Sequence, residues 1–200
     1  MAKSTRANLL ETAKRLFSER GFYGVSIADI AADQGVTKQA LLHHFSTKEK
    51  LYGEVLQDIS SRFDTQLSKI QTSGEAADAR FKQMLLELIP YTPDELAETR
   101  LLMRELLDNP QRAKTAGNWY LRPFLETLTE SLKSAPCWSN ASDAEALAAI
   151  YQVLGAINYF GISEATLTGI FGDDAYGELR RAFSPQLARL IDTLLANPPS

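Results

Sequence analysis

The sequence predicts an all-α protein in which a small N-terminal three-helix unit precedes a larger C-terminal helical bundle. Three observations lead to this fold class. Apolar residues recur at helical spacing along most of the 200 residues, no alternation of period two lasts long enough for a strand, and prolines fall mostly at or near the joins between helices. We expect an N-terminal domain over residues 1–53 and a C-terminal domain over residues 54–200.

The first helix is predicted over residues 5–20. Leu9, Ala13 and Phe17 lie on one face at helical spacing, and Gly21 follows the last helical residue. Glycine is favoured there because it adopts a positive φ without steric cost. The apolar face of this helix should support the two helices that follow it.

Two short helices joined by a tight turn come next, which is a helix-turn-helix arrangement. Ser26 and Asp29 have the spacing of a capping box, so the first of the two begins directly after the serine. Gly35 can take the left-handed conformation that ends this helix. Thr37 is a suitable N-cap for the second helix, which should run to about Phe45.

The second helix has distinct inward and outward sides at about 100° per residue. Leu41 and Phe45 face inward with Thr37 and His44 at their edges, whereas the outward arc holds Lys38, Gln39, Leu42 and His43. Lysine can donate to guanine, glutamine can pair with adenine, and Leu42 or Ala40 can touch a thymine methyl group. The expected DNA-binding residues are Ser26, Thr37, Lys38, Gln39, Ala40, Leu42, His43, His44 and Lys48.

A third helix should begin near Thr47, because Ser46 and Glu49 also have capping-box spacing. The free N–H groups of its first turn, together with Lys48, would form a phosphate site. Helical spacing continues to about Ile70, so one long helix should join the two domains. A ligand that moved its far end would also move the DNA-binding helices.

These helices, with the sequences GVTKQALLHHF and STKEKLY, resemble the N-terminal DNA-binding domain of TetR-family transcriptional regulators. The resemblance covers residues 5–55, although family members usually carry tyrosine in place of Leu42 and alanine in place of Gln34. It implies a ligand-responsive dimeric repressor that binds a near-palindromic operator in double-stranded DNA and is released by a small-molecule effector.

Charge is distributed unevenly along the chain. The whole chain carries a formal charge of −4, but residues 1–53 hold eight Lys or Arg against five acids, net +3, which leaves net −7 on residues 54–200. A basic end on an acidic body fits contact with nucleic acid at that end only. Lys3 and Arg6 lie near the start of the first helix, where they would either reach phosphates or only add solubility.

Composition also limits the compartment and the chemistry. Cys137 is the single cysteine and there are only two histidines, so we expect no disulfide, no metal site and no cofactor. No signal-peptide pattern opens the chain. The most apolar stretch, residues 146–162, is interrupted by Gln152 and Asn158 and is short of a spanning length. We therefore expect a cytoplasmic protein with no membrane partner.

The C-terminal domain should contain five further helices after a break at residues 72–78. They are predicted over residues 77–89, 94–107, 109–134, 142–168 and 173–195. Pro123 and Pro185 fall inside two of them, where we expect a kink or a break.

The helix over residues 142–168 is apolar nearly all round, so both of its sides must be covered. One side can face its own core and the other a second copy; the alternative is the central core helix of a monomer. With the closing helix over residues 186–195, it resembles the helix pair that forms the dimer interface in TetR-type proteins. The expected interface residues are Ala149, Gly155, Ala156, Leu187, Leu190, Ile191 and Leu194.

A small-molecule pocket would lie between helices of the larger domain. Its aromatic, soft and polar candidates favour a small, largely apolar or planar ligand, and an arginine inside it would indicate an anion. The candidates are Phe63, Phe81, Met103, Arg104, Trp119, Tyr120, Arg122, Tyr151, Asn158 and Tyr159.

The sequence also bears on two other classes of function, an enzyme and a protein-interaction module. An enzyme is not expected, because His43 and His44 point about 100° apart on one helix and no acid completes a metal site with them. The main alternative is a protein–protein interaction module that uses the helix-turn-helix on a protein partner. The basic outer face at Lys38, His43 and Lys48 argues against this alternative.

Overall fold

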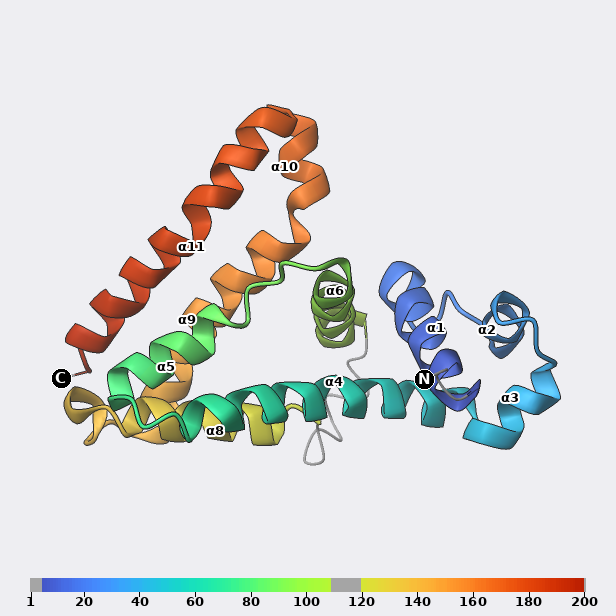
Figure 1. Ribbon diagram of the computed structural model, residues 1–200, viewed down its shortest axis with the longest axis horizontal. Coiled ribbons are helices and arrows are strands. Elements are labelled where there is room, and N and C mark those ends of the chain that lie inside the picture. The colour runs from blue at the N-terminus through green and yellow to red at the C-terminus, as the bar shows by residue number, and fades with distance from the viewer. Residues whose placement is uncertain (1–4, 109–119, 200) are drawn as a thin grey trace. The chain divides into compact units, whose positions relative to one another are not determined.

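The computed structural model is all-α, and it describes residues 5–108 and 120–199 (Figure 1). The chain opens with α1 (Thr5–Arg20), α2 (Ile27–Asp33), α3 (Lys38–Phe45) and the long α4 (Lys48–Gln71). It continues with α5 (Ala77–Leu86), α6 (Pro93–Asp108), α8 (Arg122–Lys133), the 3₁₀ turn η2 (Pro136–Trp138), α9 (Asp143–Ile162), α10 (Glu164–Phe171) and α11 (Asp173–Ala196). The described residues contain no strand, as the sequence predicts.

The first of two compact units comprises the described residues of 1–62 and 92–120. It holds α1, α2, α3, the first part of α4, and α6. Leu9, Phe17, Ile30, Phe45 and Tyr52 are at most 1% exposed and form part of its core. This unit is not the same as the sequence-based domain over residues 1–53, because α6 packs along α1.

The second unit comprises residues 63–91 and the described residues of 121–200. Its core is built from α5, α8, α9 and α11, with Phe81, Leu128, Trp138, Ile150 and Ile191 buried together. The indole Nε1 of Trp138 donates to the carbonyl oxygen of Leu194 at 3.2 Å, which ties η2 to the end of α11. Helix α10 joins α9 to α11 at one end of this unit (Figure 1).

The start of α4 differs from the sequence prediction. Ser46 has φ 62° and its amide donates to the carbonyl oxygen of Leu42 at 2.8 Å, so it ends α3. The amide of Lys50 donates instead to Thr47 Oγ1 at 3.1 Å. The predicted Ser46–Glu49 capping box is therefore wrong, because Ser46 is already used to end one helix and Thr47 caps the next.

The helix predicted over residues 142–168 is divided into α9 and α10, which are bent by 61°. At the break, the Ser163 hydroxyl donates to the carbonyl oxygen of Tyr159 at 2.5 Å, and the Ser163 amide to that of Phe160 at 3.1 Å. Local hydrogen bonds of serine compete with the regular helical pattern. No single helix of the described chain is long and apolar enough to cross a membrane, although α9 and α10 together pass by length and composition.

The two prolines inside predicted helices have different effects. Pro123 lies in the first turn of α8, where its missing N–H costs nothing. The earlier part of that predicted helix, residues 109–119, lies outside the described residues. Helix α11 continues through Pro185, so the chain does not break there, and the kink that was the other expectation stays a prediction. Pro185 is exposed, and solvent can hydrate the carbonyl that loses its helical donor there.

Candidate nucleic-acid interface

The first helix of the helix-turn-helix begins as its sequence predicts. The amide of Asp29 donates to Ser26 Oγ at 3.1 Å, and the amide of Ser26 donates to Asp29 Oδ2 at 2.7 Å. This reciprocal pair is a capping box, so two amides that would lack helical partners are satisfied. The hydrogen bond from the backbone of Ser26 also lowers the pKa of the exposed Asp29 carboxyl.

The turn between α2 and α3 depends on one glycine and one threonine. Gly35 has φ 64°, the left-handed conformation that its position in the sequence predicts. Val36 follows and donates its amide to the carbonyl oxygen of Ala31 at 3.0 Å. Thr37 then caps α3, since its Oγ1 accepts from the amide of Ala40 at 3.1 Å. These contacts fix the residue at which α3 begins.

Helix α3 turns its apolar side inward and a polar side outward. Leu41 and Phe45 are fully buried, as predicted, and Leu42 is partly buried. His44, expected at the edge of the inward side, is exposed. The exposed side chains of the helix are Lys38, Gln39, Ala40, His43 and His44. A cation, an amide and two imidazoles on one short exposed helix can all hydrogen-bond to base edges in a major groove.

Lys48 lies at the start of α4, where phosphate contact was expected. Its Nζ is 4.2 Å from the centroid of the Phe22 ring, and partial burial lowers its pKa, although Glu49 and Asp29 act in the opposite direction. The cap residue Thr47 is exposed beside it. The sequence does not single out Thr47 as the cap, because Ser46 directly before it is an equally suitable cap residue.

Near the start of α1, Arg6 pairs with Glu54 and lies 5.0 Å from the centroid of the Phe45 ring. Its guanidinium therefore bridges α1, α3 and α4 within the first unit. Lys3, the other basic residue considered there, lies outside the described residues.

Helix α1 braces the helix-turn-helix through two polar contacts. Arg15 Nη2 lies 2.7 and 2.8 Å from the two carboxylate oxygens of Asp33, and this contact raises the pKa of Arg15. Gln34 Nε2 donates to Thr12 Oγ1 at 2.6 Å. Gln34 stands where the resemblance gives alanine, so this departure adds a contact between α1 and α2. The long side chain at a helix end was the only sequence signal for it.

The residues proposed for an effector pocket are divided between the two units. In the first unit, Arg104 donates to carbonyl oxygens of α1, and the carbonyl oxygen of Tyr120 accepts from Ser60 at 2.5 Å. Met103, also in this unit, is partly buried. Trp119 lies outside the described residues.

The second unit contains the remaining pocket candidates. Phe63 packs against Phe124 with ring centroids 5.2 Å apart, whereas Phe81 is fully buried in the core. Arg122 is exposed and pairs with Glu126 at 2.7 Å. Tyr151, Asn158 and Tyr159 lie on α9, where the two tyrosines are 49% and 75% exposed and Asn158 is partly buried.

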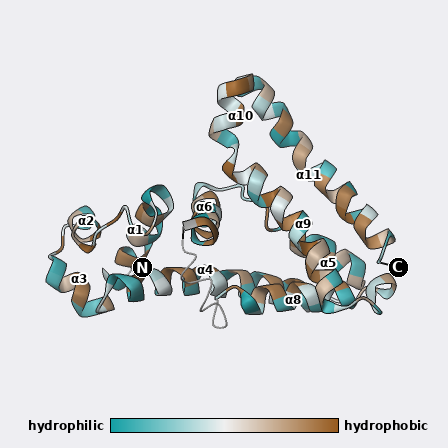
Figure 2. Cartoon of the chain, turned by 180° about the vertical axis from the view of Figure 1, so that it is seen from behind, coloured by the Kyte–Doolittle hydropathy of each residue, from teal (hydrophilic) through white to brown (hydrophobic). Residues whose placement is uncertain are grey.

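The residues proposed for a dimer interface also differ in exposure. Gly155 and Leu190 are exposed, and Ala156 and Leu194 are partly buried. The other three are in the core of the second unit, namely Ala149, Leu187 and Ile191. Figure 2 shows apolar residues at the α10 end of this unit, where Tyr159, Ile170 and Phe171 are 64–75% exposed.

An open groove of about 490 Å³ lies on the surface of the second unit between α9 and α11. Trp138 and Val153 are among its lining residues, together with Ala149, Leu190 and Leu194 of the proposed dimer interface. None of the nine effector-pocket candidates that the structure describes lines it.

Comparison with known proteins places the N-terminal helices in one family. Residues 9–55 match the sequence model of bacterial regulatory proteins of the tetR family. The probable HTH-type transcriptional regulator YttP of Bacillus subtilis is 27% identical over 110 residues, which are 53% of this chain and 52% of that protein. The HTH-type transcriptional repressor KstR2 of Mycobacterium tuberculosis is 41% identical over 54 residues, 27% of each chain. The chain thus spans about half the length of the first relative and about a quarter of the second.

The fold resembles solved structures over nearly the whole chain. A transcriptional regulator from Rhodococcus sp. Rha1 superimposes with a TM-score of 0.71 at 19% identity, covering 96% of this chain and 97% of that one. The matched helix-turn-helix and this fold agree with the expected all-α architecture. Residues 9–55 therefore carry the DNA-binding helices of the tetR family of bacterial regulatory proteins, and the relatives and the fold together support a TetR-family transcriptional regulator.

Proposed function

We propose that this chain is a ligand-responsive, dimeric repressor that binds a near-palindromic operator through α3 and is released by a small molecule. One observation supports DNA binding: the short, capped helix α3 exposes Lys38, Gln39 and His43 to solvent. Leu41 and Phe45, on its opposite side, are fully buried and anchor the helix in the first unit. Such a helix fits a major groove. The similarity to a protein named as a repressor supports the direction of regulation.

A dimer is needed because one recognition helix reads only a few base pairs. Two copies would place their α3 helices in successive major grooves, about 34–36 Å apart. The exposed face of α9 with Tyr151, Gly155 and Tyr159, and the adjacent Leu190 on α11, supports a homodimer through these two helices. An exposed apolar face of this kind marks an interaction surface.

Release by an effector completes the proposal. The effector would be small and largely apolar or planar, because Phe63 and Phe124 supply an aromatic pair in the second unit. An effector that favours one of two arrangements of the dimer's two helix-turn-helix units lowers DNA affinity by its coupling free energy, typically about 1–3 kcal/mol or roughly 5–150-fold.

The experiment that tests this proposal is a selection of the purified full-length chain on random duplex DNA. We expect enrichment of a near-palindromic site with half-sites about one helical turn apart or slightly more. Analytical ultracentrifugation of the same sample should give a dimer. A folded dimer that enriches no sequence at low salt would contradict the proposal.

Salt dependence separates DNA binding from the use of α3 on a protein partner. Contacts to phosphates release counterions, so affinity for the selected duplex should fall steeply between about 50 and 200 mM salt. An apolar protein interface would lack this dependence. Affinity that does not change with salt would therefore favour the protein-interaction alternative.

A further inference from the structure

Helix α6 buries two acids in the first unit. Glu98 is 3% exposed and Glu105 is 5% exposed, and the fully buried Leu101 lies between them on the same face of the helix. Glutamate is almost never buried to this extent unless it is paired. The docking of α6 therefore depends on polar partners that the surrounding helices must supply.

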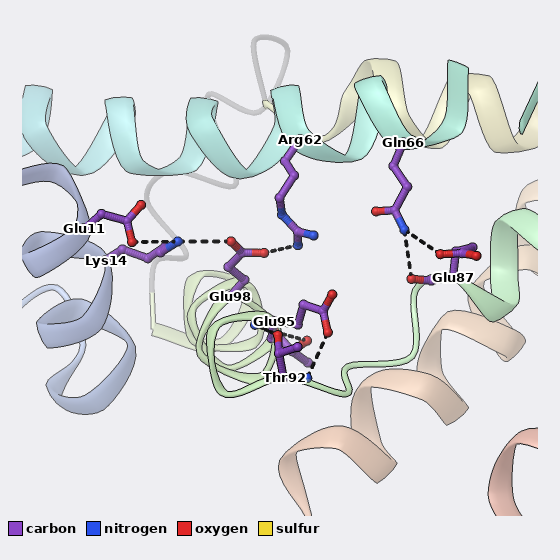
Figure 3. A network of polar contacts seen from close by, with 9 residues as sticks. Glu11, Lys14, Arg62, Gln66, Glu87, Thr92, Glu95 and Glu98 are labelled. Atoms are coloured by element: carbon purple, nitrogen blue, oxygen red, sulfur yellow. Dashed lines mark hydrogen bonds and ion pairs between the residues drawn. The ribbon is translucent and has the colours of Figure 1, made fainter. Parts of the chain in front are cut away.

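Glu98 joins α6 to both α1 and α4 (Figure 3). Its Oε1 lies 3.3 Å from Lys14 Nζ of α1, and its Oε2 pairs with Arg62 Nη2 of α4. Lys14 also lies 3.5 Å from Glu11. Burial opposes the charge on Lys14, but Glu98 and Glu11 outweigh it and raise the lysine pKa. Three helices of the first unit thus meet at one carboxylate.

Glu105 makes a second connection on the same face, about two helical turns further along α6. The hydroxyl of Tyr52, a buried residue of α4, donates to Glu105 Oε2 at 2.8 Å. The Tyr52 ring packs edge-on against Phe17 at 4.9 Å and lies 5.0 Å from Phe22, centroid to centroid. The ammonium group of Lys48 lies over the ring of this same Phe22. This contact therefore reaches the start of α4, where phosphate binding is proposed.

Arg104 caps the end of α1. Its Nε donates to the carbonyl oxygen of Ser18 at 3.1 Å and its Nη2 to that of Glu19 at 3.0 Å. The last carbonyls of a helix lack helical donors, and a cation there also interacts favourably with the helix dipole. Helix α6 thus satisfies the open end of α1 in addition to packing on its side.

We propose that α6 belongs functionally to the DNA-reading unit, and that Glu98 and Glu105 are positioning residues. They hold α1 and α4 in the arrangement that DNA binding requires, and α1 and α4 in turn position α2 and α3. This inference rests on the proposed function. Helix α6 lies outside residues 9–55, which match the family. The path from α6 to α3 runs through α1 and α2. Arg15 of α1 pairs with Asp33 at the end of α2, and Thr12 of α1 accepts a hydrogen bond from Gln34, the C-cap of α2.

A buried charge network is a weak means of stabilisation, since well-packed apolar residues of similar volume often do as well or better. It does fix the directions in which three helices approach one another. Replacing the network by apolar residues should therefore preserve stability but alter the orientation of the helices, and the two effects can be measured separately.

The experiment uses the full-length chain and the duplex selected by the wild type. Glu98→Gln leaves Lys14 and Arg62 facing a neutral amide, so we expect DNA affinity to fall about 10-fold or more. Base preference should stay the same, because α3 itself is unchanged. Tyr52→Phe removes only the hydroxyl that reaches Glu105 and should weaken binding a few-fold. Glu126→Gln, which removes an exposed acid paired with Arg122, is the matched control and should bind as the wild type does.

A triple apolar variant, Lys14→Met, Arg62→Leu and Glu98→Leu, separates positioning from stability. We expect it to unfold at or above the wild-type temperature and still to bind the duplex about 10-fold more weakly. Hydrogen exchange in residues 16–20 of α1 should be faster than in the wild type. Wild-type affinity in both Glu98→Gln and the triple variant would overturn this inference alone, whereas a wild-type chain that selects no DNA would overturn it together with the proposed function.

Discussion

At the scale of single residues, DNA recognition should separate into base-reading and phosphate-binding side chains. Gln39 is exposed in the first turn of α3, and Lys48 lies at the start of α4. Contacts to base edges carry sequence information, while contacts to phosphates mainly fix position. The two side chains should therefore respond differently to truncation.

Gln39→Ala should relax base preference at one position of each half-site. A glutamine paired bidentately with adenine discriminates against other bases by about 1–3 kcal/mol. Because Gln39 is exposed, its truncation should not change the folding of α3. Repeating the DNA selection with the variant measures this effect. An unchanged site preference would show that the base-reading side of α3 has been assigned to the wrong residues.

Lys48→Ala should weaken binding to all DNA sequences alike. Removing one phosphate contact should lower the slope of log affinity against log salt by about 1. The ammonium lies over the Phe22 ring in the free chain, so part of any loss reflects this packing. Titrations of selected and unrelated duplexes at several salt concentrations give the slope. A loss confined to the selected sequence would instead make Lys48 a base-reading residue.

At the scale of the helices, the sequence predicts most accurately those features that depend on neighbouring residues. The capping box at Ser26, the left-handed Gly35 and the Thr37 cap each involve partners within a few residues. All three were expected, and all three are present. The break at Ser163 was missed because hydropathy continues across it. A local side-chain hydrogen bond does not alter a hydropathy pattern.

The placement of α6 could not be predicted from local pattern. Lys14 and Glu98 are 84 residues apart in the chain. Nothing near Glu98 in the sequence distinguishes it from the many exposed acids of a helical protein. Only the fold shows that this acid is buried against α1 and α4. Long-range pairs of this kind explain why the first unit extends beyond the N-terminal domain predicted from the sequence.

The cap of α2 should make this helix sensitive to acid. The hydrogen bonds from Ser26 lower the pKa of Asp29 below its usual value, so the folded state binds a proton less readily than the unfolded chain. The stabilisation is therefore complete above the unfolded pKa of about 3.9 and is lost as pH falls through the lower folded value.

Thermal unfolding between about pH 6 and pH 2.5 measures this contribution, and Asp29→Asn removes its titration. We expect the variant to be less stable than the wild type at pH 6 and to approach it in acid. Glu126→Gln serves as the control, because Glu126 is exposed on α8 in the other unit. A stability difference that stays constant with pH would mean that Asp29 does not act through its charge.

At the scale of the whole molecule, the proposed function depends on two copies joining through α9 and α11. Figure 2 shows the apolar residues of α9 continuing into α10, and the structure buries only one side of α9 within its own unit. Ile150, Val153 and Ile157 are at most 1% exposed, whereas Tyr151 and Tyr159 on other sides are open. The open groove beside Leu190 could accept a helix of the second copy.

Gly155→Leu should convert the dimer to a monomer. Gly155 is exposed, and an added Cβ would meet nothing within 4 Å in the chain itself, so the variant can fold. A leucine at this position would hold the helices of two copies apart. Ultracentrifugation should show monomer at concentrations where the wild type is dimeric, and affinity for the palindromic duplex should fall by at least about 10-fold. Ala79→Leu adds comparable bulk to an exposed position of α5 and should leave both unchanged. A fully dimeric Gly155→Leu variant would place the dimer interface elsewhere on the molecule.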